Sequence, residues 1–427
     1  MEPKNNNAVP AGQFHPAIGL NDKPALGPLL LYALQWWVVS LPCVVIMGLI
    51  VARLQGLDLA EQVFSMQKLF ALVGAVTVIQ VLWGHRLPLV VGPASTLLVG
   101  IVASSAAGPM AMYTAICFGG GVLALASFSG LLSHTRRFFT PRIVSVILIL
   151  IAFTLAPSIL DLIFAGQGKQ VARLIFALAM VLGMVVLNFL LKGAAKSLTV
   201  FLGSALGIGA YALVFGLDPL PELKAGGGAL FIAAAHLDAG TVLSFLFCFL
   251  ALTINELGSV ESIGHMLRAD DMTGRVKRGA GFQGLANMAA GAMGIIGPVD
   301  FSLSAGLISS TGCASRFTLV PAGIGLMACA LAPNLVLLLC VIPATVMGAL
   351  MLYLMATQLA SGLSMLVSER GIDDFSSGLT VALPLMIGLI IAFAPQSAFA
   401  ELPALLRPIV GNGFVMGTIT VIFMEHV

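Results

Sequence analysis

Charged side chains are scarce in this chain. Of its 427 residues only 9% are Asp, Glu, Lys or Arg, whereas 59% are hydrophobic. A soluble domain carries about 25% charged residues, so the composition excludes an ordinary soluble globular protein. The net charge of +2 indicates no partner by itself, and no nucleic acid is expected to bind.

Cysteine is also rare, and its placement excludes several kinds of site. The six cysteines make no Cys-x-x-Cys pair, and all lie within apolar runs. They are interpreted as small core residues rather than disulfide partners or metal ligands. No cofactor and no metal are therefore expected. A signal peptide is not expected either, because the first apolar run starts at about Leu29, after a polar arm over 1–28, and is too long for one.

Long apolar runs dominate what remains, and many reach the roughly 20 residues that a membrane helix needs. The sequence therefore predicts an all-α polytopic membrane protein with about 14 segments. The third and tenth are short for a full crossing. The predicted segments are 29–52, 66–83, 87–105, 109–132, 141–165, 171–191, 197–216, 241–267, 279–296, 298–312, 316–332, 334–364, 377–394 and 404–424.

The distribution of Lys and Arg predicts the orientation of these segments. With the N-terminus in the cytoplasm, 14 of the 20 Lys and Arg residues fall on the cytoplasmic side. Cytoplasmic connections carry an excess of these residues. We therefore expect both termini in the cytoplasm and the chain in the lipid bilayer of a plasma (bacterial inner) membrane.

The two short segments share an interruption. Gly92-Pro93 breaks the third segment and Gly297-Pro298 breaks the tenth, and an apolar half-helix follows each pair. Matched interruptions of this kind indicate an inverted-repeat transporter with its site at the middle of the membrane. The alternative is that each Gly-Pro merely kinks a helix. Because the interruptions stand at the third position of each seven-segment half, the prediction is a 7+7 inverted repeat.

Four acids fall within the predicted segments: Asp161, Glu256, Glu261 and Asp300. An ionisable group at this depth costs at least about 2.5–3.5 kcal/mol and is a functional candidate by default. Asp161 stands near a helix end, where its side chain can reach the membrane interface.

The two glutamates differ in the helix face that they occupy. Glu261 shares a face with Gly258, Ser262 and His265, which are the surroundings of a ligand cavity, although a structural pair with His265 is the alternative. Glu256 stands about 140° around the helix, where it either holds the fold together or lies near the end of the segment. A buried carboxyl of this kind is also a natural proton-coupling element.

Several segments resemble the nucleobase–ascorbate transporter family, also called the xanthine/uracil permease family, over nearly the whole chain from about Leu20 to Met424. "VESIGH" (260–265) is similar to the family motif in the eighth span, and its substrate-binding glutamate corresponds to Glu261. Gln35 matches the glutamine of the first span, but Trp36 stands where a histidine is usual, and Gln283 stands where an acid is common. In the tenth-span signature Gly306 and Thr311 agree with the family, whereas Leu303-Ser304 replaces its Gln/Glu-Asn pair.

The resemblance implies a core domain (29–132 and 241–332) and a gate domain (141–216 and 334–424), with short strands breaking spans three and ten. It implies a small-molecule nucleobase as substrate, such as uracil, xanthine or urate, with proton symport, elevator-like movement and a homodimer. The expected proton-coupling residues are Glu261, His265 and Asp300. Phe301 would stack on the base, or is ordinary packing. The expected substrate-binding residues are Glu261, Gln35, Ala94, Ser95, Asp300, Phe301 and Ser302.

Other functions fit parts of the same sequence. An anion transporter or exchanger of the 7+7 fold, for sulfate or bicarbonate, would use the dipoles of the half-helices and is favoured slightly by the missing span-ten acid, whereas the Glu261 motif opposes it. An intramembrane enzyme would need a zinc motif or a nucleophile–base pair, and neither is present. A sensor or scaffold that does not transport is a further alternative. We expect a transporter and not an enzyme.

Overall fold

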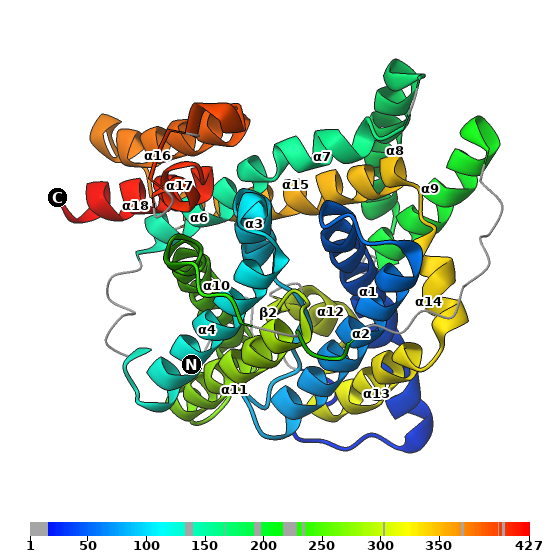
Figure 1. Ribbon diagram of the computed structural model, residues 1–427. Coiled ribbons are helices and arrows are strands. Elements are labelled where there is room, and N and C mark those ends of the chain that lie inside the picture. The colour runs from blue at the N-terminus through cyan, green and yellow to red at the C-terminus, as the bar shows by residue number, and fades with distance from the viewer. Residues whose placement is uncertain are drawn as a thin grey trace, which may run out of the picture.

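The computed structural model describes residues 16–132, 140–166, 168–191, 198–216, 229–232, 235–301, 304–368, 371–399, 401–403 and 406–427. These residues form helices joined by short connections, with one two-stranded sheet near the middle of the molecule (Figure 1). The elements of the first half are α1 (Leu26–Leu54), α2 (Leu59–Leu82), β1 (Val90–Pro93), α3 (Ser95–Ala103), η1 (Ser105–Ala107), α4 (Pro109–Phe128), α6 (Pro141–Thr154), α7 (Ala156–Ile163), α8 (Gln170–Leu190) and α9 (Thr199–Phe215). Those of the second half are α10 (Ala239–Met266), α11 (Met272–Met293), β2 (Pro298–Phe301), α12 (Ser304–Thr311), η4 (Arg316–Thr318), α13 (Leu319–Ala330), α14 (Pro333–Cys340), α15 (Ala344–Ser368), α16 (Phe375–Phe393), η5 (Gln396–Phe399), α17 (Arg407–Val410) and α18 (Gly413–His426).

The described helices confirm a polytopic membrane protein. Eight are long and apolar enough to cross a bilayer. Shorter or more polar helices and the two broken crossings, β1–α3 and β2–α12, supply the other segments of a fold with about 14. The prediction of one segment over 334–364 is wrong in detail, because α14 ends at Cys340 and lies at 86° to α13, and α15 begins at Ala344. Pro343 stands in the gap, where it has no N–H to continue a helix.

The packing repeats itself between the two halves, as an inverted repeat requires. The contact between α4 and α11 has its counterpart in the contact between α13 and α2. Helix α13 stands seven segments after α4, and α11 stands seven segments after α2. In the same way, α1 packs on β1 as α10 packs on β2, and the pair α8 and α9 corresponds to the pair α16 and α18. This symmetry confirms the predicted 7+7 inverted repeat.

Glycine allows the closest of these helix contacts. A Cβ atom on Gly284 of α11 would lie 2.7 Å from the carbonyl oxygen of Gly120 of α4. In the equivalent pair, a Cβ on Gly323 of α13 would lie 2.8 Å from the carbonyl oxygen of Gly74 of α2. Helices in membranes associate through small residues that let backbones approach. Both pairs of helices are therefore joined backbone against backbone.

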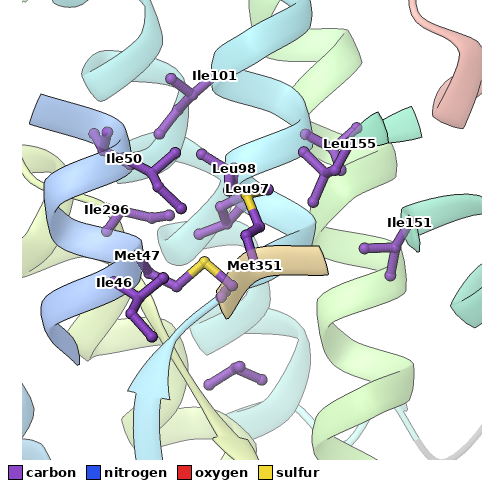
Figure 2. Close-up of a cluster of buried hydrophobic side chains, with 14 of the residues drawn as sticks. Ile46, Met47, Ile50, Leu97, Leu98, Ile101, Ile151, Leu155, Ile296 and Met351 are labelled. Carbon is purple, nitrogen blue, oxygen red and sulfur yellow. The ribbon is translucent and has the colours of Figure 1, made fainter. Parts of the chain in front are cut away.

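An apolar layer lies where the broken third crossing meets the helices around it (Figure 2). The layer takes side chains from α1 and α3 on one side and from α6 and α15 on the other. It contains Ile46, Met47, Ile50, Leu97, Leu98, Ile101, Ile151, Leu155, Ile296 and Met351. Residues of the two sides are held by dispersion contacts, which have no preferred direction.

Part of the predicted polar arm over 1–28 packs onto the second half. The Ile18 N–H donates to the carbonyl of Gly312 (3.2 Å), and the Ala314 N–H donates to the carbonyl of Ile18 (2.9 Å). Helix α1 begins at Leu26, and residues 1–15 lie outside the described residues. The described end of the arm is thus a surface segment paired with the chain that follows α12.

Candidate functional site

The two broken crossings meet directly. Strands β1 and β2 pair antiparallel, with Gly92 opposite Val299 and Pro93 opposite Pro298. Neither proline has an N–H group to donate, and the pairing continues one step further, since the amide of Ala94 donates to the carbonyl of Gly297 (2.9 Å). This confirms the prediction that short strands break the third and tenth segments.

The two glycines of the breaks leave space that neighbouring side chains fill, and a larger residue at either position would collide with them. A Cβ on Gly92 would meet the ring of Phe301, and a Cβ on Gly297 would meet the side-chain oxygen of Asn287. The Asn287 amide donates to the carbonyl of Pro298 (3.0 Å) and so ties α11 to the start of β2. The breaks are therefore held by specific side-chain contacts from α11 and from the opposite strand.

Helix α3 begins immediately after β1 and has no side-chain cap at its N-terminus. Free N–H groups at the start of a helix attract a negative or hydrogen-bond-accepting group. The hydroxyl of Thr96 is buried and has no hydrogen-bond partner in the described part of the chain. The hydroxyl of Ser95 lies 3.4 Å from the side-chain oxygen of Gln358 on α15. The first turn of α3 thus keeps polar groups available beside the strand pair.

Helix α10 carries two stripes of different character. Glu256, Ser259, Val260 and Ile263 are spaced along one face and are all buried. This face contacts β2, since the amide of Asp300 donates to Glu256 Oε2 (3.1 Å) and the Ser259 hydroxyl donates to the Asp300 carbonyl (3.2 Å). The buried stripe therefore holds β2 in place.

The second stripe of α10 is open. Gly258, Ser262 and His265 are exposed, and Glu261 is half-buried. A Cβ on Gly258 would meet no atom within 4 Å. The structure thus places Glu261, His265, Gly258 and Ser262 on one face, away from the face that carries Glu256.

Asp300 lies in a fully buried polar cluster. Both its carboxyl and the imidazole of His85 have no exposed surface, and His85 Nε2 lies 3.1 Å from Asp300 Oδ2. His85 comes from the turn between α2 and β1, where its Nδ1 accepts a hydrogen bond from the Leu87 N–H (2.9 Å). Asp300 is therefore grouped with Glu256 and His85, and not with the open stripe.

The other predicted residues have varied surroundings. Gln35 is half-buried on α1, Ala94 is fully buried at the start of α3, and Phe301 is half-buried against Gly92. Ser302 lies outside the described residues. Trp36, which stands where the family has a histidine, donates from its indole nitrogen to the hydroxyl of Thr318 (2.9 Å).

Three residues near the strands were not among the predicted site residues. His85 joins the Asp300 cluster, and Gln358 reaches Ser95 from α15. Ser304 accepts from the Val90 N–H (2.9 Å), so the residue that replaces the family's asparagine links β1 to α12. Each of these three contacts joins residues more than 200 positions apart in the sequence. No local motif predicts such a contact.

Two of the cavities among the described helices have charged residues in their linings. One of about 1140 Å³ is bounded by α1, α2, α8, α9 and α14, and its lining includes Arg53, Lys169 and Arg173. Another of about 630 Å³ is bounded by residues of α1, α3, α7 and α16 and includes Asp161. Neither lining includes Glu261 or Asp300. In the described part of the chain, no group of three His, Cys, Asp or Glu residues is placed to hold a metal ion.

The inverted repeat, the paired broken crossings and the polar face of α10 together define a membrane permease of the 7+7 class. A family model described as "Permease family", of the xanthine/uracil permease type, matches residues 27–397. The chain belongs to this family, the nucleobase–ascorbate transporter or xanthine/uracil permease family.

Several curated relatives are similar to this chain along most of its length. The nucleobase transporter PlUacP of Paenibacillus larvae is 25% identical over 365 residues, which cover 82% of this chain and 83% of the relative. The uric acid permease PucJ of Bacillus subtilis is 25% identical, with 82% of each chain covered. The uric acid transporter UacT of Escherichia coli is 22% identical, with 97% of this chain and 89% of the relative covered.

Solved structures with the same fold come from other transporters. The transmembrane domain of the cyanobacterial bicarbonate transporter BicA superposes with a TM-score of 0.61 at 14% identity, covering 86% of this chain and 96% of that domain. The murine anion transporter Slc26a9 gives a TM-score of 0.59 at 15% identity, covering 92% of this chain and 68% of its own. At such low identity the likeness shows the 7+7 fold alone.

Proposed function

We propose that this chain is a secondary active transporter that imports a nucleobase, such as urate, xanthine or uracil, by proton symport. The named relatives include nucleobase and uric acid transporters, and this supports the substrate class. Transport leaves the substrate chemically unchanged, so the proposal includes no enzymatic step.

The open stripe of α10 carries the proposal. A polar face that includes a glutamate is costly against lipid and favourable against a wet cavity. The stripe runs past Gly258, whose missing side chain leaves open space, and it includes Glu261, Ser262 and His265. It provides a carboxylate on an open polar face of α10, against which a planar base would bind.

The base would be held by groups of complementary hydrogen-bonding character. Glu261 accepts N–H bonds from the ring, and the uncapped first turn of α3 donates to a carbonyl oxygen from Ser95. Ala94, whose own amide bonds the Gly297 carbonyl, lies beside it against the base. Gln35 contacts a second carbonyl, Phe301 packs against the ring, and Ser302 is a candidate of the same group. In this arrangement His265 and Asp300 act with Glu261 in proton coupling.

Movement would take place between two bodies, the core domain (29–132 and 241–332) and the gate domain (141–216 and 334–424). The apolar layer of Figure 2 lies between elements of the proposed core, α1 and α3, and elements of the proposed gate, α6 and α15. Dispersion contacts let two surfaces slide without breaking directional bonds, which suits elevator-like movement. We further propose a homodimer in a bacterial inner membrane, with both termini in the cytoplasm.

One observation favours an anionic substrate. The cavity of about 1140 Å³ is lined by Arg53, Lys169 and Arg173 and, among the described residues, by no acid. Clefts lined with one sign of charge concentrate the opposite charge. Urate meets this preference as a nucleobase anion. An inorganic anion such as sulfate or bicarbonate is the second candidate.

The test is uptake into proteoliposomes of purified protein. Labelled uracil, xanthine, urate, sulfate and bicarbonate are compared with and without an inward proton gradient. We expect a base, and neither inorganic anion, to accumulate, and we expect Glu261→Gln to abolish that accumulation. Glu401→Gln, a change at an exposed glutamate, is the matched control and should transport as the wild type does. Accumulation of sulfate or bicarbonate alone would replace the proposal by its alternative.

A further inference from the structure

The polar cluster around Asp300 contains two buried carboxyl groups with few hydrogen-bond donors and no free cation among the described residues to stabilise a negative charge. Glu256 and Asp300 both have no exposed surface, and the two carboxyl groups are close enough to interact. Three of their four oxygens, Glu256 Oε1 and both Oδ1 and Oδ2 of Asp300, have no hydrogen-bond partner among the described residues. Burying an ionised carboxyl without a partner is far more costly than burying a neutral one.

The groups that face the pair do not neutralise it. The charged and titratable side chains packed around it in the described chain are His85, from the turn after α2, and Arg275, from α11. The guanidinium of Arg275 is already engaged, because it bonds the carbonyls of His85 and Arg86 and forms an ion pair with Asp270 (2.6 Å). No cation is therefore free for the pair among the described residues.

His85 is arranged as a neutral donor. Since its Nδ1 accepts from the Leu87 amide, the ring proton of the neutral imidazole is on Nε2. That atom lies 3.1 Å from Asp300 Oδ2, without a well-aligned hydrogen bond. His85 thus lies beside Oδ2 of Asp300, and Oδ1 of Asp300 has no hydrogen-bond partner among the described residues.

We propose that Glu256 and Asp300 share one exchangeable proton and form the proton-binding site of the transporter, with His85 as a positioning residue. Two neighbouring buried carboxyl groups titrate as a pair, because they cannot both ionise cheaply. The proton belongs to the pair, and it satisfies an oxygen that otherwise lacks a partner. The inference rests on the proposed transport function and adds to it the residues Glu256 and His85.

The position of the pair provides a route for coupling. Glu256 stands on the buried stripe of α10, and Glu261 stands on the open stripe of the same helix. The amide of Asp300 bonds Glu256, so a change in the charge of the pair alters the contact between α10 and β2. Substrate at the open stripe and a proton at the buried pair would then act on the same two elements. No bond other than those to the proton forms or breaks, since the proton binds from water on one side and leaves to water on the other.

The first test needs no substrate. Infrared difference spectroscopy of the purified protein at neutral pH should show the C=O stretch of a buried carboxylic acid. We expect that band to disappear in Glu256→Gln and in Asp300→Asn, and to persist in Asp161→Asn, a matched change of an exposed acid within α7. Absence of the band from the wild type at every pH overturns the inference, whether or not the variants fold, and so does its persistence in both cluster variants.

The second test measures coupling. With one proton carried per base, a pH gradient of one unit should concentrate a neutral base about tenfold in wild-type proteoliposomes. In Glu256→Gln and Asp300→Asn we expect this accumulation to fall to about onefold, while exchange of labelled for unlabelled base continues. His85→Asn should shift the pH at which half-maximal accumulation occurs. Full accumulation in either cluster variant, or its loss in Asp161→Asn, overturns the inference. A wild type that transports no base contradicts the proposed function instead, and the infrared result then stands alone.

Discussion

The close contact at Gly284 between α4 and α11 predicts whether Gly284→Ala stabilises or destabilises the protein. Adding a methyl group at Gly284 places a carbon 2.7 Å from the Gly120 carbonyl oxygen and closer still to the amide of Ala124, whereas ordinary contact begins at 3.4 Å. Both neighbours are backbone atoms of α4, which cannot rotate away as a side chain can. Helix α4 must therefore retreat from α11 by about 0.7 Å or more.

The two effects of Gly284→Ala oppose each other. Replacing glycine by alanine inside a helix favours folding by about 1 kcal/mol, whereas overpacking a tight contact costs roughly 1–3 kcal/mol. Because the contact is backbone against backbone, we expect the upper part of that cost and a net loss of about 1–2 kcal/mol. For a chain of this length that lowers the melting temperature by about 1–2 °C, at roughly 2.1 cal/mol/K of unfolding entropy per residue.

The assay is thermal unfolding of the purified protein in detergent, followed with a thiol-reactive dye, since five of the six free cysteines are buried and the sixth is half-buried. Gly183→Ala is the matched control, because a Cβ at Gly183 of α8 meets nothing within 4 Å. We expect the control to raise the melting temperature and Gly284→Ala to lower it. Gly323→Ala, in the equivalent contact of α13 with α2, should behave like Gly284→Ala. If Gly284→Ala stabilises the protein as much as the control does, the close contact described here is wrong.

Two other predictions concern ion pairs at the ends of helices. Glu425 accepts from Arg142 (2.6 Å) and ties α18 to α6, so Glu425→Gln should cost about 1.5–3 kcal/mol, seen as a lower melting temperature than that of the wild type. The Arg275 guanidinium, by a hydrogen bond and by its charge, holds the pKa of the Asp270 carboxyl below its ordinary 3.8. The stability contributed by that pair is present above pH 3.8 and is lost as the pH falls through the lowered pKa. The melting temperature of the wild type should therefore decline at acid pH, and this decline should be smaller in Asp270→Asn. An unchanged acid-side decline would contradict the assignment.

Much of the fold was predictable because lipid limits the backbone structures that can cross a membrane. Apolar runs of membrane length predict helices, and a Gly-Pro pair inside such a run predicts a break, since neither residue supports a regular helix. The positions of β1 and β2 follow from Gly92-Pro93 and Gly297-Pro298 for this reason. The break between α14 and α15 was not predicted, because 334–364 is apolar throughout and its single internal proline, Pro343, was included in one predicted segment.

The surroundings of the site were predictable only where they are local. Helical spacing alone placed Glu261 with His265 and separated both from Glu256. The partners of Glu256 and Asp300 come from other elements, and the contact with His85 spans more than 200 residues of sequence. A single sequence carries no signal for such a contact. The roles assigned to Glu261, His265 and Asp300 remain predictions for the experiments above.

The pairing of β1 with β2 has a consequence for how the protein is made. Strand β1 finds its partner strand, and the Ser304 hydroxyl that accepts from its Val90 amide, only in the second half of the chain. Pro298 follows Val90 by 208 residues, which takes roughly 10 to 40 s to synthesise at 5–20 residues per second. Throughout that interval the third crossing has backbone groups that lipid cannot satisfy. We expect the third crossing to stay out of contact with lipid, at the insertion machinery, until the tenth crossing is synthesised. When the ribosome is stalled before β2, the third crossing should therefore react with water-soluble reagents.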